Sequence, residues 1–200
     1  MNQYTITPIT GQPDWESIPV MEVANHQWLP QTDIQMQAQV CYDETGLYVH
    51  LRAVEKDIRA ELNQPLCEIC EDSCMEFFFR PVEGDLRYFN VEINPNCCTY
   101  LGYGINLPEL MRLAPENEEA LMEKKSRRTP DGWEVFFKYP IAYIRVFYPG
   151  YELTPGKKLY GNCYKCGDKT VKPHFITWSE IHTPEPCFHK PEDFGLMILG

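Results

Sequence analysis

Hydrophobic and polar residues alternate most clearly in residues 72–96, where two alternating runs are separated by a turn. Alternation with a period of two is typical of a strand with one buried face. Gly84 and Asp85 supply the turn, and Pro95 ends the second run because it has no backbone N–H to donate. The stretch therefore predicts a β-hairpin with one apolar and one polar face. The apolar positions are Met75, Phe77, Phe79, Phe89, Val91 and Ile93, and the positions between them are Cys74, Glu76, Phe78, Arg80, Tyr88, Asn90, Glu92 and Asn94.

The pairing register of this hairpin decides what its polar face presents. In one register Glu76 lies opposite Glu92, and the two carboxylates repel each other unless they share a proton, a cation or a ligand. In the other register Glu76 lies opposite Asn90 and no conflict arises. The sequence leaves both registers open.

Similar patterns predict strands along the rest of the chain. Two further hairpins are expected, one from residues 34–42 and 47–54 and one from residues 124–129 and 133–139. The only helical pattern, at 109–125, is interrupted by Pro115 and predicts no more than a short helical turn. Other strands are expected at 4–9, 20–28, 97–106, 159–166, 175–178 and 194–199, and long loops at 55–71 and 141–155.

About ten strands in serial hairpins, with hardly a helix, indicate an all-β protein. The expected architecture is an antiparallel β-sandwich or jelly roll. The 200 residues are enough to bury a core without disulfide or metal staples, and neither a repeat nor an interdomain linker is evident. We therefore expect a single domain over residues 1–200.

The charge and cysteine content narrow the class of partner and the compartment. A formal net charge of −11 argues against binding to a nucleic-acid backbone or to an anionic membrane surface. The sequence shows neither a transmembrane stretch nor a signal peptide. Nine cysteines, an odd number, favour free thiols in a reducing compartment, so a cytoplasmic location is expected.

Four of the cysteines have the pair spacing of a zinc site. Cys67 and Cys70 form one pair and Cys163 and Cys166 the other. The second pair falls in a predicted strand, where residues three apart point to opposite faces unless a turn intervenes. Unligated, mostly buried thiols are therefore favoured over a structural zinc ion.

The polar face of the 72–96 hairpin is the best candidate for a binding site. Short hydrogen-bonding side chains on rigid strands suit a ligand rich in hydroxyl groups, although an ordinary solvated sheet face has a similar pattern. Glu76 and Glu92 are also candidates for the acid and base of a glycoside hydrolase. Trp178 precedes a loop rich in proline, histidine and aromatic residues and is a candidate platform for a sugar ring. The alternative is that Trp178 is a core or rim-filling residue.

Several segments, taken in order over nearly the whole chain, resemble the family nine carbohydrate-binding modules, in particular their stand-alone family nine-like branch. The agreement lies in the ordered set rather than in any one segment. The matching segments are Leu-Tyr-Val at 47–49, Glu-Asp-Ser at 71–73, Met-Glu-Phe-Phe-Phe at 75–79, Phe-Asn-Val-Glu-Ile-Asn-Pro at 89–95, Asp-Gly-Trp-Glu-Val at 131–135, Gly-Asn-Cys-Tyr-Lys-Cys-Gly at 161–167, His-Phe-Ile-Thr-Trp at 174–178 and Phe-His-Lys-Pro-Glu-Asp-Phe-Gly at 188–195.

This resemblance implies an antiparallel jelly-roll sandwich that binds sugars between two tryptophans, often outside the cell, and that holds structural metal ions, usually calcium. Trp178 resembles one stacking tryptophan, and Glu71 and Asn94 resemble polar contacts of the site. The chain departs from the family in two places. The loop at 65–70 has no aromatic residue for the second wall, and Glu92 stands where sugar-binding members can carry arginine.

The leading hypothesis is non-catalytic binding of a mono- or oligosaccharide. Its expected site residues are Trp178, Glu71, Asn90, Glu92 and Asn94. A structural calcium ion is the expected metal, with zinc at the cysteines the less favoured alternative. Two other hypotheses stay open: a sugar-processing enzyme that uses Glu76 and Glu92 as acid and base, and a metal-stabilised interaction scaffold without a sugar site.

Overall fold

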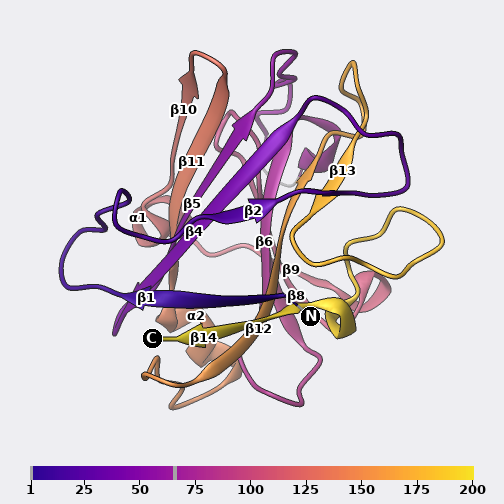
Figure 1. Cartoon of the computed structure of the whole chain (residues 1–200). Coiled ribbons are helices and arrows are strands. Elements are labelled where there is room, and N and C mark those ends of the chain that lie inside the picture. The colour runs from indigo at the N-terminus through magenta and orange to yellow at the C-terminus, as the bar shows by residue number, and fades with distance from the viewer. Residues whose placement is uncertain (1, 65–66) are drawn as a thin grey trace.

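The protein is described from a computed structural model, which covers residues 2–64 and 67–200. The described residues form fourteen strands, two short α-helices and three 3-10 turns (Figure 1). The strands are β1 (Gln3–Pro8), β2 (Met21–Val23), β3 (Asn25–His26), β4 (Gln35–Asp43), β5 (Gly46–Val54), β6 (Cys74–Arg80), β7 (Tyr88–Ile93), β8 (Thr99–Gly104), β9 (Met111–Leu113), β10 (Lys125–Thr129), β11 (Gly132–Pro140), β12 (Lys158–Cys166), β13 (Phe175–Thr177) and β14 (Gly195–Leu199). The 3-10 turns are η1 (Ile69–Glu71), η2 (Leu107–Glu109) and η3 (Pro191–Asp193), and the helices are α1 (Glu118–Met122) and α2 (Ile141–Phe147).

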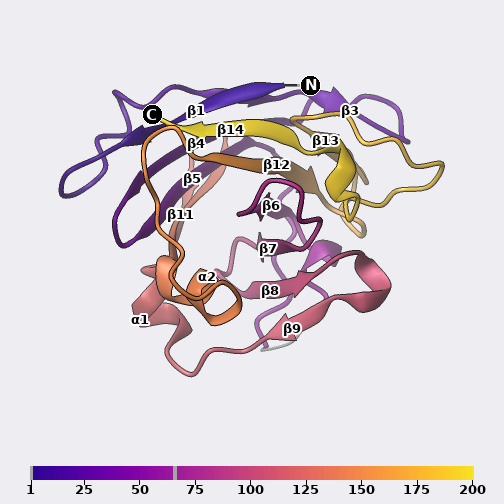
Figure 2. The same cartoon turned by 90° about the horizontal axis from the view of Figure 1, so that it is seen from below.

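The strands form two curved layers that are joined through β1. The first four residues of β1 pair with β14, and its last two residues pair with β4 (Figure 2). The strand order is β10-β11-β5-β4-β1-β14-β12-β6-β7-β8-β9, with β2, β3 and β13 at the edges. Both pairings of β1 are parallel, so the expectation of a purely antiparallel sheet is wrong at this strand. A short hairpin forces the two strands that it connects to run antiparallel. No hairpin connects β1 to β4 or β14, so β1 can run parallel to both.

The other predicted hairpins are confirmed. β4 pairs with β5 and β10 with β11, both antiparallel. The expected strand at 20–28 is divided between the layers, since β2 pairs with β4 and β3 with β13. The jelly-roll winding stays a prediction.

The helices differ from the sequence-based expectation. Residues 118–122 form α1, within the segment where a short helical turn is expected. Residues 141–147 form α2, although a loop is expected there. The aromatic residues of that segment hide a helical spacing, since Tyr143 and Phe147 are four residues apart and both pack on the core. None of the helices in the described part of the chain has the length and apolar character required to cross a membrane.

The main core lies between the two layers. It receives Met75, Phe77 and Phe79 from β6 and Phe89, Val91 and Ile93 from β7, as the alternation predicts. Trp133, near the start of β11, is fully buried in this core.

The opposite face of β6, β7 and β12 is also buried. The sequence pattern predicts that this face of the β6–β7 hairpin is exposed to solvent, and that prediction is wrong. A second apolar cluster covers this face and includes Phe78, Tyr88, Tyr164, Phe188 and Phe194. Phe188 and Phe194 belong to the long segment that follows β13, so a loop rather than solvent covers these strands. Several residues of this second cluster also line a cavity on that face.

A buried ion pair joins the ends of the two layers. The Lys165 Nζ lies 3.2 Å from Glu55 Oε2 and donates a hydrogen bond to His174 Nε2 at 2.8 Å. Burial opposes ionisation of Glu55, but the ammonium of Lys165 and hydrogen bonds from Ser73 and Trp133 outweigh it and hold the pKa of Glu55 below its ordinary value. Burial and the same ammonium lower the pKa of His174 to about 4, so its ring is neutral and Nε2 accepts the hydrogen bond from Lys165.

Candidate functional site

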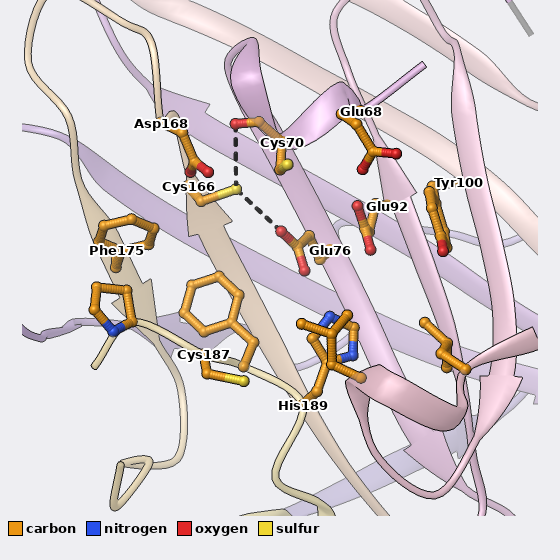
Figure 3. A pocket seen from close by; sticks show the side chains of 14 residues that line it. Glu68, Cys70, Glu76, Glu92, Tyr100, Cys166, Asp168, Phe175, Cys187 and His189 are labelled. Atoms are coloured by element: carbon orange, nitrogen blue, oxygen red, sulfur yellow. Dashed lines mark hydrogen bonds between the residues drawn. The ribbon is translucent and has the colours of Figure 1, made fainter. Parts of the chain in front are cut away.

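A cavity of about 280 Å³ lies on the face of β6, β7 and β12 that points away from the main core (Figure 3). Five strands (β6, β7, β8, β12 and β13) and four connecting segments contribute residues to it. Its lining contains four acids (Glu68, Glu76, Glu92 and Asp168), three aromatic residues (Tyr100, Phe175 and Phe188), three thiols (Cys70, Cys166 and Cys187), and Leu107, Leu110, Pro186 and His189. This lining contains no lysine or arginine among the residues that the structure describes.

The floor of the cavity is formed by two opposed glutamates. The register of β6 and β7 places Phe77 opposite Val91 and Glu76 opposite Glu92, so the structure adopts the register that brings the two carboxyl groups together. Glu76 is 3% exposed and Glu92 is 7% exposed. Neither glutamate forms an ion pair among the described residues.

Each glutamate has one hydrogen bond to a neighbouring side chain. The Asn90 amide donates to Glu92 Oε1 at 2.8 Å, and the Cys166 thiol donates to Glu76 Oε1 at 3.0 Å. No hydrogen bond from a described residue reaches the second carboxyl oxygen of either glutamate. Both groups line the cavity, so these oxygens are available to a ligand.

Burial shifts both carboxyl groups toward their protonated forms. It raises the pKa of Glu92 to about 8, with a further contribution from the charge of Glu68. Burial and the neighbouring Glu92 raise the pKa of Glu76 well above its ordinary value. Burial also raises the pKa of Asp168, with the charge of Glu71 adding to the effect. The floor is therefore largely neutral at pH 7 and offers carboxyl O–H donors as well as acceptors.

Aromatic rings form the walls. Phe188 stacks on Tyr164, with ring centroids 4.2 Å apart and planes 11° from parallel. The guanidinium of Arg112 lies over the Tyr100 ring, 4.0 Å from its centroid. Tyr100 and Phe175 are partly exposed, so both offer ring surface to the cavity. Burial lowers the pKa of His189 to about 4, and the neutral ring bonds the Tyr88 hydroxyl through Nδ1 at 2.7 Å.

The residues predicted for the site are only partly brought together. Glu92 lines the cavity, and Asn90 holds its carboxyl group from behind. Asn94 is fully buried and bonds Asp72 and the Leu62 carbonyl, outside the cavity lining.

Glu71 and Trp178 also lie outside the lining. Glu71 forms an ion pair with Lys169 at 2.8 Å. Trp178 is 7% exposed and belongs to the main core, where Gly195 lies against its ring. A Cβ atom at position 195 would lie 2.4 Å from the indole, so only glycine leaves enough room for the Trp178 ring. Trp178 thus has the core position that was the alternative to a stacking role, and its contact with a sugar stays a prediction.

Sequence reasoning missed most of the cavity walls. Tyr100, Phe175 and Asp168 come from three separate segments that meet only in the folded chain. Pro65 and Leu66, in the loop where a second aromatic wall is lacking, lie outside the described residues.

The four-cysteine zinc set is ruled out by the geometry. Cys163 points into the main core and Cys166 into the second cluster, because the two lie three residues apart on the continuous strand β12. Among the described residues, three or more His, Cys, Asp or Glu side chains converge in one place, at Cys74, Glu76 and Cys166. The structural calcium ion stays a prediction.

A second, larger hollow of about 390 Å³ lies on the other layer, against β5, β10 and β11. Trp15, Tyr48 and Phe136 line it together with basic side chains. The nearby acid Glu134 is already paired with Arg127 and with His50, whose Nε2 lies 2.7 Å from the carboxylate. This hollow therefore lacks the unpaired buried polar groups of the first cavity.

The comparisons with known proteins agree with one another. The model of a family described as carbohydrate-binding family 9 matches residues 10–199. A crystal structure of a proposed carbohydrate-binding protein from Bacteroides uniformis is similar, with a TM-score of 0.86, 24% identity and 99% of each chain covered. None of the curated proteins matches the chain.

Two further similar structures are of a family 9 carbohydrate-binding module from Caldicellulosiruptor kristjanssonii. The complex with glucose has a TM-score of 0.72 and 11% identity, and covers 100% of this chain and 96% of the module. The complex with cellotriose has a TM-score of 0.70 and 12% identity, and covers 99% and 93%. At these identities the structural likeness shows a shared β-sandwich fold.

Proposed function

The chain belongs to carbohydrate-binding family 9, and we propose that it binds a saccharide, without catalysis, in the cavity above Glu76 and Glu92. The observation that carries this assignment is the pair of buried glutamates with unpaired carboxyl oxygens, set between aromatic walls. A sugar needs hydrogen-bonding groups for its hydroxyls and an apolar surface for its C–H face, and this cavity supplies both. The similar modules in complex with glucose and cellotriose support the ligand class.

Within the cavity, each group has a distinct role in this proposal. Glu92 and Glu76 bond the hydroxyls from below, and Asn90 orients Glu92. Tyr100 and Phe175 supply the ring surface that the resemblance assigned to tryptophans. The volume of about 280 Å³ is near the lower end of the ~300–1,000 Å³ of small-molecule sites and suits one sugar unit or a chain end.

A thermal-shift screen against mono- and oligosaccharides tests this function. A ligand that binds only the native state raises the melting temperature by mass action. We expect a concentration-dependent rise with at least one neutral sugar and no change with polyols of similar size. The absence of a shift with every saccharide tested would count against the proposal.

The catalytic alternative uses the same two glutamates. Their raised pKa values are what a general acid requires, so the bound sugar is also analysed for products after long incubation. We expect the saccharide to be recovered intact. Turnover that disappears in the Glu92→Gln variant would instead establish the enzyme.

A further inference from the structure

Two thiols and a carboxyl group meet at one end of the cavity floor. The register of β6 and β12 places Cys74 directly opposite Cys166, and Glu76 follows Cys74 by two residues on the same face. The two sulfur atoms and one carboxyl oxygen all lie within 4.8 Å of one another. All three side chains are at least 97% buried. They come from two hydrogen-bonded strands, so the backbone fixes their relative positions.

No lysine, arginine or histidine among the described residues forms an ion pair with the carboxyl group of Glu76. The one nearby ammonium, that of Lys165, is on the opposite face of β12 and is engaged with Glu55 and His174. Glu92 lies directly opposite and is another acid, so it supplies no cation. Buried carboxylates are normally paired with a cation or coordinate a metal ion, and this one has only a thiol as a donor.

We propose that Cys74, Cys166 and Glu76 bind a divalent cation of the thiophilic class, with Zn²⁺ as the best-fitting ion. Zinc is held at about 2.3 Å by thiolates and about 2.0–2.2 Å by carboxylates, so tetrahedral ligand atoms lie roughly 3.5–3.8 Å apart. Atoms already within 4.8 Å reach this arrangement by small side-chain rotations. Calcium and magnesium prefer oxygen ligands and do not suit two sulfurs.

The fourth coordination position points toward the cavity. Cys166 and Glu76 both line the cavity, and no fourth ligand from the described residues is within the same cluster. Cys70 contributes another thiol to the same wall, and its carbonyl accepts the Cys166 thiol at 3.9 Å (Figure 3). A water molecule, a ligand hydroxyl or the Cys70 thiol is therefore the candidate for the remaining position.

Binding involves no change of oxidation state. Each of the two S–H bonds breaks as a sulfur–metal bond forms, and the two protons leave to solvent. A third proton leaves if the Glu76 carboxyl is protonated beforehand. Affinity for the metal must therefore fall as the pH is lowered, because protons compete for the same three ligands.

Metal titration of the reduced, chelator-treated protein tests the site. Co²⁺ serves as the spectroscopic probe, since cobalt–thiolate bonds give sulfur-to-cobalt charge-transfer absorption in the near ultraviolet. We expect one ion per chain, displacement by Zn²⁺, and loss of most of the charge-transfer band in Cys166→Ser and in Cys74→Ser. The affinity should fall by more than the ~10–100-fold that loss of an outer partner costs.

Two further variants separate ligand loss from misfolding. Cys163→Ala removes a buried thiol from the same strand but on the core face, and it should bind Co²⁺ as the wild type does. Glu76→Gln should weaken binding yet keep the thiolate band. A titration without a thiolate band, or one in which folded Cys166→Ser binds like the wild type, would overturn the proposal. So would thiol counting that finds Cys74 and Cys166 joined in a disulfide under the same reducing conditions. No saccharide is present in these assays, so their outcome is independent of the proposed sugar binding.

Discussion

Glu76 and Glu92 lie directly opposite each other on β6 and β7, and both are more than 90% buried. Two carboxylates in this position repel each other, and burial penalises their charges further. The protein relieves this conflict by holding protons on the pair, since the pKa of Glu92 is about 8 and that of Glu76 is well above the ordinary value.

The protonated pair makes stability depend on pH near neutrality. The unfolded carboxyl groups ionise near pH 4–5, whereas folded Glu92 keeps its proton to about pH 8 and the pKa of Glu76 is raised as well, so the native state binds more protons in between. The stabilisation is fully present at low pH and is lost as pH rises through the folded pKa. We expect the free energy of unfolding to fall between pH 6.5 and 8, by about 1.4 kcal/mol per pH unit for each proton retained.

Denaturant unfolding at several pH values measures this slope. Glu92→Gln should flatten it, because the amide cannot ionise. Glu116→Gln is the control, since Glu116 is an exposed glutamate outside the cavity lining, and its slope should match the wild type. An unchanged slope in Glu92→Gln would show that the Glu76–Glu92 pair does not cause the pH dependence of the free energy of unfolding.

Removing only one partner of the ion pair between Lys165 and Glu55 should strongly destabilise the protein. Lys165→Met leaves the Glu55 carboxylate buried without its cation, and we expect a loss of about 3–5 kcal/mol in the free energy of unfolding. The double variant Lys165→Met/Glu55→Gln should recover part of this loss, because no unpaired charge remains. Thermal or denaturant unfolding of the three proteins checks the prediction. Single and double variants of equal stability would contradict it.

Trp178 should contribute to stability rather than to sugar contact. Trp178→Ala removes a buried indole from the main core, and we expect a loss of about 3–5 kcal/mol. Trp178→Phe keeps most of the apolar volume and should retain saccharide affinity within about threefold. If folded Trp178→Phe lost saccharide affinity altogether, the core placement of this ring would not describe the bound protein.

The charge of the cavity should select among sugars. The two glutamates of the floor hold protons, but the charge of Glu68 remains, and no lysine or arginine among the described residues of the lining offsets it, so an anionic sugar meets like charge. We expect a uronic acid to bind at least about tenfold more weakly than the corresponding neutral sugar. Glu68→Gln should narrow this gap. Calorimetry of both ligands provides the comparison, and equal affinities would speak against this cavity as the site.

The sequence predicts the hairpins and the main core well, because alternation reports directly which face of a strand is buried. The sequence leaves the register of β6 and β7 open, because alternation reports only the face on which a side chain lies and not its partner across the strands. The two possible registers differ by two residues, and a shift of two keeps every side chain on its face. The hydrophobic pattern is therefore silent on whether Glu76 meets Glu92 or Asn90.

Other features depend on contacts that a local pattern does not contain. The second buried face arises because the segment after β13 folds over β6, and the only local signals were Phe78 and Tyr88 among the polar positions. The core position of Trp178 had a signal, since Ile176 two residues earlier on β13 faces the core. The cavity walls come from β8, β12 and the loops, so their assembly depends on the tertiary fold.

Isothermal titration of a saccharide found in the screen, into wild type, Tyr100→Ala and Tyr48→Ala, tests the central claim most directly. Tyr100 lines the cavity above the two glutamates, and Tyr48 is a partly exposed tyrosine that lines the second hollow. We expect Tyr100→Ala to lose about tenfold or more in affinity, the equivalent of ~1–2 kcal/mol for a lost aromatic contact, and Tyr48→Ala to bind as the wild type does. Loss of affinity in Tyr48→Ala with none in Tyr100→Ala would place the sugar in the other hollow and contradict the account.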